Sequence, residues 1–333
     1  AVMSQTDLRE RFDSFQADAV SAIVRDFTQK GNGRYLLVIP TGGGKTITAA
    51  KAVNQLFDGG TLDSSLDTVL WTAHRTELLD QASAAYSLLT DLCQDHMRYA
   101  ERVRFEMIAS VKRKLENDAS ISLVVIDEAH HGAANSYQPI FQRENLGVLG
   151  LTATPSRHDG MPLAFERESY SIGFPDLVKK GIILRPEVRI VEGGTYEIDS
   201  LDSDDDLGVL DNARRNQEII AELLRHPEDY KKVVIYVGTR SHVRNLYRSL
   251  LNSPLKPLYQ SIGYITGEGN SRNQDRRQFV ETEKGFDRSI VVNVHVLSEG
   301  YDDPSVNTAV MATPTRSKLY YMQAMGRVIR KNP

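Results

Sequence analysis

Short apolar runs alternate with longer amphipathic stretches along the whole chain. As a group, the apolar runs lack polar alternation, which is typical of parallel strands that are buried on both faces. We predict strands at Tyr35–Ile39, Thr68–Thr72, Phe105–Ala109, Leu123–Ile126 and Val148–Leu151, then at Val188–Val191, Val233–Val237, Ile262–Ile265, Ile290–Val294 and Thr308–Met311. Helical periodicity predicts helices between them at Phe15–Phe27, Thr46–Phe57, Thr76–Leu89, Asn212–Leu224 and Arg240–Leu251. Strands that alternate with helices indicate an α/β fold with parallel sheets.

The two series of strands predict two domains. Proline and glycine, the strongest local breakers of regular structure, crowd the stretch from Thr154 to Pro186. We therefore expect a first domain at residues 1–175, a linker at 176–186 that begins with a short helix, and a second domain at 187–333. The acid-rich stretch Glu192–Leu210 is interpreted as a solvated surface loop, with a regulatory acidic strip as the alternative.

Composition narrows the class of protein. The 333 residues are enough for about two domains, and 41% hydrophobic with 25% charged residues is ordinary for a folded chain. The net charge of −4 means that any binding of nucleic acid must use a local surface. The single cysteine, Cys93, excludes an internal disulfide framework and fits a reducing compartment. Since no apolar run approaches the ~18 residues of a membrane span and no apolar signal segment starts the chain, we expect a cytoplasmic protein.

A glycine-rich loop between a predicted strand and a predicted helix carries the first chemical signal. Residues 39–46 are Ile-Pro-Thr-Gly-Gly-Gly-Lys-Thr, and this context is what a phosphate-binding loop requires. Backbone amides of Thr41–Gly44 (Thr41, Gly42, Gly43 and Gly44) would surround phosphates, Lys45 would reach the β- and γ-phosphates, and Thr46 would ligate Mg²⁺. Ile39 stands where the strict pattern has a glycine, and a glycine turn with an incidental lysine is the alternative interpretation.

An acidic box ends a second predicted strand. Asp127 follows the apolar run Leu123–Ile126 and would hold Mg²⁺ opposite the glycine loop, while Glu128 would orient or deprotonate an attacking water. One alternative is a metal site formed by Glu128, His130 and His131, although it lacks the H-E-x-x-H spacing. The other is a purely structural strand end.

With these motifs, the chain resembles the superfamily 2 helicases and translocases of the DEAH-box group. Within that group it is similar to the XPB-like and type III restriction-subunit-like DNA helicases, whose acidic box often has a second histidine, as in Asp127–His131 here. The resemblance covers essentially the whole chain. It implies a P-loop NTPase of two tandem RecA-like parallel-sheet domains, with ATP and Mg²⁺ as cofactors.

The resemblance also assigns roles in the first half of the chain. Gln16 would read adenine, and His74, Arg75 and Ser110 would contact nucleic acid. Thr152 and Thr154, in the run Leu151–Pro155, would couple hydrolysis to domain movement. Each residue also has a plain structural interpretation, as a helix-surface residue, a turn or a cap.

Four further motifs follow in the family's order in the second half. Thr239 and Arg240, and after them Thr266 and Gly267, would contact the nucleic-acid backbone. In the next motif, Gly300 would take part in coupling and Asp302 would contact the ribose of the nucleotide. In the last motif, Gln323 would take part in coupling, and Arg327 and Arg330 would be arginine fingers that act on the transferring phosphate. Their plain interpretations are turns and a solvated basic helix.

The resemblance implies an ATP-dependent DNA helicase or duplex translocase, with ATPase activity stimulated by nucleic acid. Such a motor would serve a restriction, repair or phage-defence system, together with a nuclease or accessory subunit outside this chain. The alternatives are an RNA helicase with the same core and a nucleotide-gated binding switch without net translocation. The chain stops at Asn332-Pro333, directly after the last motif, and Arg75 to Ser110 is short for a first domain. Both features predict a motor core of a longer protein.

Overall fold

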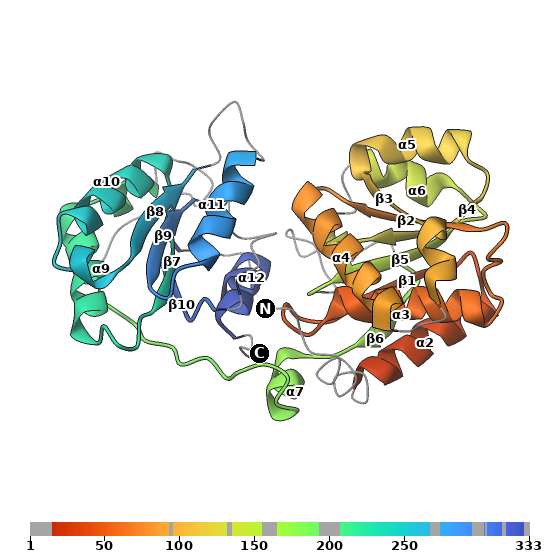
Figure 1. The fold of residues 1–333 in the computed structure, drawn as a ribbon, viewed down its shortest axis with the longest axis horizontal. Coiled ribbons are helices and arrows are strands. Elements are labelled where there is room, and N and C mark those ends of the chain that lie inside the picture. Colours follow the sequence, from red (N-terminus) through yellow and green to blue (C-terminus); the bar gives the residue numbers. More distant parts are fainter. Residues whose placement is uncertain are drawn as a thin grey trace. The chain divides into compact units, whose positions relative to one another are not determined.

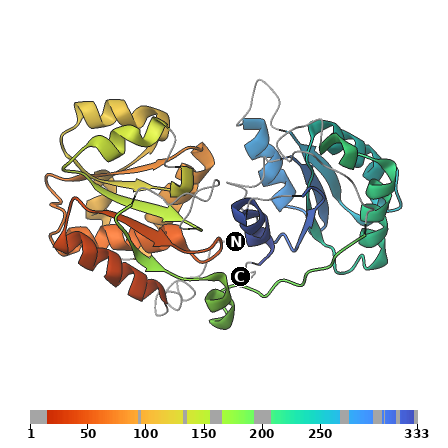
Figure 2. The ribbon, with the colours of Figure 1, turned by 180° about the vertical axis from the view of Figure 1, so that it is seen from behind.

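The computed structural model describes residues 15–92, 96–131, 135–154, 165–192, 207–266, 274–294, 303, 305–314 and 318–329. They form two compact units, which divide between Ile182 and Ile183. Each unit is a parallel sheet with helices on both faces (Figure 1; Figure 2, from behind). The two parallel α/β domains expected from the hydrophobic pattern are therefore confirmed. No helix in these ranges is long and apolar enough to cross a membrane.

The sheet of unit 1 has six parallel strands in the order β3-β2-β4-β5-β1-β6. Their bounds are β1 Arg34–Val38, β2 Thr68–Ala73, β3 Val103–Met107, β4 Ile121–Ile126, β5 Gly147–Thr152 and β6 Arg167–Ser171. Every residue of β2 and β5 is buried, as expected for central strands covered on both faces.

Two groups of helices cover the sheet of unit 1. The helices of unit 1 are α2 Phe15–Gln29, α3 Lys45–Asp58, α4 Thr76–Leu92, α5 Ile108–Asn117, α6 Gln138–Gln142 and α7 Phe174–Lys179, and all but α7 belong to these two groups. Short 3₁₀ segments lie at His96–Arg102, Ala129–His131 and Asn135–Tyr137. Side chains of α5 and α6, such as Val111 and Ile140, form one core with Val124 and Ile126 of β4. Helices α2, α3 and α4 lie side by side on the other face (Figure 1).

Unit 2 has four parallel strands in the order β10-β7-β9-β8. Its elements are α9 Ala213–Arg225, β7 Lys232–Tyr236, α10 Arg240–Leu251, β8 Ser261–Ile265, α11 Gln274–Lys284, β9 Ser289–Asn293, β10 Thr308–Met311 and α12 Lys318–Val328, with 3₁₀ segments at Gly208–Leu210 and Lys256–Leu258. Helices α9 and α10 pack on one face, where Leu223 and Leu246 meet Ile235. Tyr320 and Ala324 of α12 pack on the opposite face.

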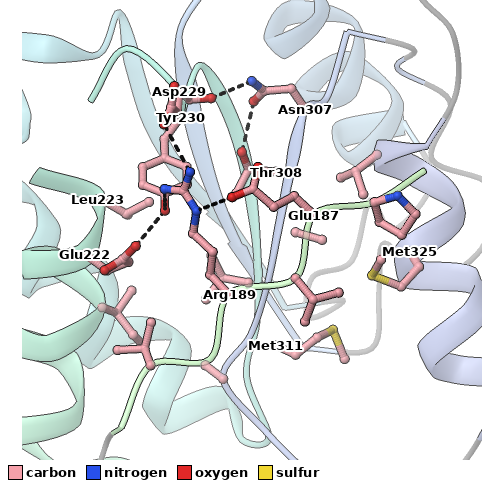
Figure 3. A pocket seen from close by; sticks show the side chains of 18 of the residues that line it. Glu187, Arg189, Glu222, Leu223, Asp229, Tyr230, Asn307, Thr308, Met311 and Met325 are labelled. Atoms are coloured by element: carbon pink, nitrogen blue, oxygen red, sulfur yellow. Dashed lines mark hydrogen bonds and ion pairs between the residues drawn. The ribbon is translucent and has the colours of Figure 1, made fainter. Parts of the chain in front are cut away.

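The strand predicted at Val188–Val191 is wrong. This segment is extended but pairs with no strand in the described part of the chain, and Val188 and Ile190 are 63% and 90% exposed. Its Arg189 donates to Glu187 Oε1 (2.8 Å) and to the hydroxyl of Tyr230 (3.1 Å), and the segment borders a groove of about 610 Å³ beside β10 (Figure 3). The apolar run therefore has the composition of a strand without a partner, and the arginine within it holds the chain against neighbouring side chains.

In unit 1, two elements also differ from those predicted from the sequence. Strand β6, Arg167–Ser171, has the polar sequence RESYS and was not predicted, because an edge strand exposes most of its side chains. The strand predicted at Phe105–Ala109 instead ends at Met107, and α5 begins at Ile108.

Candidate active site and nucleic-acid contacts

The glycine loop connects the end of β1 to the start of α3. Gly42 and Gly44 have φ values of 86° and 82°, a left-handed conformation that side chains disfavour. A Cβ atom on Gly43 would lie 2.4 Å from Ile39 Cγ2 and 3.1 Å from the carbonyl oxygen of Pro40, so only glycine fits there. Helix α3 begins at Lys45 and has no side-chain cap. No side chain therefore caps this helix N-terminus, the kind of position where helices bind anions.

Gln16 of α2 braces this loop. Its side chain is 2% exposed, and Nε2 donates a hydrogen bond to the carbonyl of Gly43 at 3.2 Å. A Cβ atom on Gly44 would lie 2.4 Å from the same Nε2. Gln16 Oε1 is buried and has no hydrogen-bond partner among the described residues. The contact with the loop gives Gln16 a positioning role, while its predicted contact with adenine stays a prediction.

The acidic box lies directly after β4, next to the loop lysine. Asp127 is 3% exposed, and its backbone N–H donates to the carbonyl of Thr72 at 2.9 Å. Burial raises the pKa of Asp127 to about 6, although the charge of Lys45 opposes this shift. Glu128 has a φ of 51°, the sole positive value for a non-glycine residue in the described ranges, and its Oε1 lies 2.5 Å from Lys45 Nζ. Such a backbone is strained and is typical of functional sites.

The end of β5 lies beside the acidic box. His130 is buried, and its Nδ1 lies 3.4 Å from Glu128 Oε2 and 3.5 Å from Thr152 Oγ1. The Thr152 hydroxyl donates to the carbonyl of Thr154 at 2.8 Å. Lys45, Asp127, Glu128 and Thr152, which are far apart in the sequence, therefore meet where β1, β4 and β5 end. Carboxyl ends of parallel strands are where open α/β sheets bind ligands.

Other predicted residues of unit 1 lie on neighbouring elements. Thr41 and Thr46 are half-buried in the loop and the first turn of α3, and His74 and Arg75 are half-buried just after β2. Ser110 was expected to close a strand, but it lies in the first turn of α5 because β3 ends two residues earlier than predicted. Its hydroxyl lies within hydrogen-bond distance of two acceptors, Glu106 Oε2 (3.0 Å) and the carbonyl of Met107 (2.9 Å). The prediction that Ser110 lies at a strand end is therefore wrong.

In unit 2, Thr239 follows β7 and caps α10. Its Oγ1 accepts a hydrogen bond from the N–H of His242 at 3.1 Å, and Thr239 is 6% exposed. Arg240 is the first residue of α10 and is exposed, and Thr266 follows β8. Gln323 and Arg327 lie on α12, but their side chains lie outside the described part of the structure. The predicted residues Gly267, Gly300, Asp302 and Arg330, and the side chain of His131, also lie outside it.

One buried ion pair in unit 2 was missed by sequence reasoning. Lys232 Nζ lies 3.1 Å from Asp303 Oδ2, and both side chains are less than 5% exposed. Asp303 also accepts a hydrogen bond from the N–H of Ser305 at 3.0 Å. The available signal was an aspartate directly after the predicted ribose-binding Asp302, but the periodicity of β7 gave no indication that Lys232 points inward.

Comparison with known proteins places these features in a family. The family described as "Type III restriction enzyme, res subunit" matches residues 10–157, and the "Helicase conserved C-terminal domain" matches residues 215–332. The chain belongs to the superfamily 2 helicases. Its resemblance to type III restriction subunits and XPB-like proteins is confirmed.

Individual relatives of this helicase core are distant. It is 24% identical over 352 residues to the Saccharomyces cerevisiae protein "Putative ATP-dependent helicase IRC3", an alignment that covers 95% of this chain and 49% of that protein. The chain thus spans about half the length of this relative.

Solved structures show the same fold. A Type ISP restriction-modification enzyme, LlaBIII, bound to DNA has a TM-score of 0.64 and 16% identity, covering 96% of this chain and 27% of that one. Mss116p bound to ssRNA and AMP-PNP has a TM-score of 0.59 and 14% identity, covering 93% and 66%. These likenesses confirm the two RecA-like domains.

Proposed function

We propose that this helicase core hydrolyses ATP to move along DNA, as a helicase or as a duplex translocase. The observation that carries the proposal is the convergence of Lys45, Asp127 and Glu128 beside the glycine loop, with Lys45 Nζ 2.5 Å from Glu128 Oε1. A cation, a buried carboxylate and a second carboxylate next to a helix N-terminus are the groups that phosphoryl transfer to water requires.

The residues at this edge fit a nucleotide and Mg²⁺. The start of α3 has no side-chain cap, and the tight glycines would let phosphate oxygens approach the backbone N–H groups there. Thr46 and Asp127 would hold Mg²⁺, and the ion would neutralise charge on the β- and γ-phosphates when bound. Gln16 keeps the loop in place through Gly43.

Each protein group then has a separate task in hydrolysis. Lys45 exchanges Glu128 for a phosphate oxygen, and the freed Glu128 orients the attacking water and accepts its proton. Arg327 and Arg330 of unit 2 supply positive charge to the transferring phosphate, a contribution of roughly 10³–10⁵ in rate in related chemistry. Asp302 contacts the ribose, and Thr152, Thr154, Gly300 and Gln323 couple hydrolysis to movement.

Nucleic acid is the proposed track, with DNA favoured over RNA. His74, Arg75 and Ser110 of unit 1, and Thr239, Arg240, Thr266 and Gly267 of unit 2, contact its backbone, which carries little sequence information. The relationship to restriction subunits supports DNA and a separate nuclease or accessory subunit. We assign residues 1–175 and 187–333 to the two motor domains, joined by 176–186.

The test is steady-state ATPase activity with no nucleic acid, single-stranded DNA, duplex DNA and RNA in parallel, with Glu128→Gln as the inactive control. We expect DNA to raise the rate, RNA to raise it less, and the control to remove both. If RNA stimulates the ATPase as much as DNA or more, RNA replaces DNA as the proposed track. An ATPase that no nucleic acid stimulates would favour the nucleotide-gated switch.

A further inference from the structure

One side of α10 carries a row of arginines. Arg240, Arg244 and Arg248 recur every fourth residue and are all exposed, and the helix contains no acidic residue. This spacing places them along one side of the helix, about 6 Å apart along its axis. His242, Val243, Leu246 and Leu250 are buried on the opposite side. The basic side is therefore directed to solvent by the packing of the apolar side.

Two tyrosines extend this basic row onto the sheet. Tyr247 lies on α10, three residues after Arg244, and its ring centroid is 4.8 Å from that of Tyr264 on β8. Tyr264 is 41% exposed and precedes Thr266 by two residues. Strand β8 is an edge strand, and α10 packs against it. The tyrosine pair therefore connects the helix of Arg240 with the strand that precedes Thr266, and both residues are among the expected backbone contacts of unit 2.

The local charge differs from that of the whole chain. The protein has a net charge of −4, whereas α10 presents three arginines and no carboxylate. Asp211 accepts hydrogen bonds from Ser241 and Asn245 of this helix, at 3.1 and 2.8 Å. A local basic surface with an exposed aromatic ring is what a single nucleic-acid strand requires, because phosphates pair with arginine and unpaired bases stack on aromatic rings.

We propose that Arg244, Arg248, Tyr247 and Tyr264, hereafter the α10–β8 strip, bind a single nucleic-acid strand beyond the contacts of Arg240 and Thr266. The two arginines pair with successive phosphates, and the ring of Tyr264, held by Tyr247, stacks on an unpaired base. This inference rests on the proposed function, because it extends the track of the same motor. It specifies a single strand, since a base within a duplex does not offer its face.

The experiment measures binding of labelled oligothymidine and oligouridine by fluorescence anisotropy over a range of salt concentrations. In the double variant Arg244→Ala/Arg248→Ala, the slope of log K against log salt should fall by roughly 1.4, because each lost phosphate contact on a single strand removes roughly 0.7. Tyr264→Ala should weaken binding by roughly 5- to 150-fold, and Tyr264→Phe should restore it. The two oligonucleotides distinguish DNA from RNA as the source of the strand.

The matched control is Arg225→Ala/Lys231→Ala, which removes two exposed positive charges of unit 2 that lie on neither α10 nor β8 and should keep the parental slope. Thermal unfolding shows whether each variant is folded. If the parent binds the strand and the strip variants bind with the same affinity and slope, or the control loses as much, the strip is overturned while the motor stands. A parent that binds no strand and whose ATPase no nucleic acid stimulates overturns both.

Discussion

Lys45 Nζ lies 2.5 Å from Glu128 Oε1, so the cation of the glycine loop is paired with the carboxylate proposed to activate water. Both side chains are nearly buried, 12% and 9% exposed. An ion pair in such a site is strong, and neither group can perform its proposed task while the pair persists. The γ-phosphate must therefore compete with Glu128 for Lys45.

The first prediction concerns this pair. Glu128→Gln should lower kcat of ATP hydrolysis by about 10²–10⁴, the usual contribution of a general base. ATP should bind at least as tightly as in the parent, because Lys45 no longer has to break an ion pair with a carboxylate to reach the phosphate. Lys45→Met should weaken binding itself. Single-turnover rates and titration with a fluorescent ATP analogue measure the two effects, and a Glu128→Gln protein that hydrolyses at the parental rate would refute the assignment.

The second prediction concerns Asp26, which joins α2 to β6. Its side chain is 1% exposed, accepts a hydrogen bond from Ser169 Oγ at 2.7 Å and pairs with Arg167. Asp26→Ala should lower the free energy of unfolding of unit 1 by about 2–3 kcal/mol, since a buried acceptor of charged hydrogen bonds is lost. The fluorescence of Trp71, the single tryptophan and buried in unit 1, reports this unfolding in urea.

The control for Asp26 is Glu166→Gln. Glu166 pairs with Lys30 at 2.8 Å, but both side chains are 40% or more exposed. An exposed pair contributes only about 0–1 kcal/mol, so this variant should unfold close to the parent. Equal losses in the two variants would contradict the buried role of Asp26.

The third prediction separates two roles of Thr239. Thr239→Val removes the cap of α10 and should cost about 1 kcal/mol, whereas Thr239→Ser should keep it. Asn212→Ala removes the equivalent cap of α9, where Asn212 Oδ1 accepts from the N–H of Arg215 at 3.0 Å, and should cost about the same. Stimulation of the ATPase by DNA should fall in Thr239→Val alone. An equal fall in Asn212→Ala would show that Thr239 acts only as a helix cap.

The fourth prediction is a pH dependence of the stability of unit 2. His242 is fully buried with Nε2 2.9 Å from Asn216 Oδ1, and burial lowers its pKa from 6.5 to about 4. Between these values the unfolded chain binds a proton that the folded protein does not. The free energy of unfolding should therefore fall as pH falls from about 6.5 to about 4, by up to about 3 kcal/mol.

Comparison with His242→Gln isolates this contribution. Circular dichroism in denaturant, at several pH values, measures the stability of parent and variant. Because glutamine does not titrate, the difference between the two proteins should shrink toward acid pH. A difference that stays constant from pH 6.5 to 4 would show that His242 is protonated in the folded state as well.

Elements with strong local signals form where the sequence predicts them. Helix α10 has the predicted bounds because buried positions recur with the helical period and Thr239 provides a cap. Strand β10 also has the predicted bounds, as a short apolar run whose four residues are half-buried. The polar strand β6 was missed and the strand at Val188–Val191 does not form. Pairing with a neighbour decides whether an edge segment is a strand, and hydrophobicity alone does not record it.

By itself, the sequence determined which local chemistry is present: strands buried on both faces, a glycine loop that opens a helix, and an acidic box at a strand end. These depend on spacing along the chain, which periodicity records directly. Only the tertiary structure decided that Lys45 pairs with Glu128, that Gln16 holds Gly43, and that Tyr264 meets Tyr247. Each contact joins segments whose approach depends on the order of strands in a sheet and the packing of helices on it, and side-chain spacing carries no information about either.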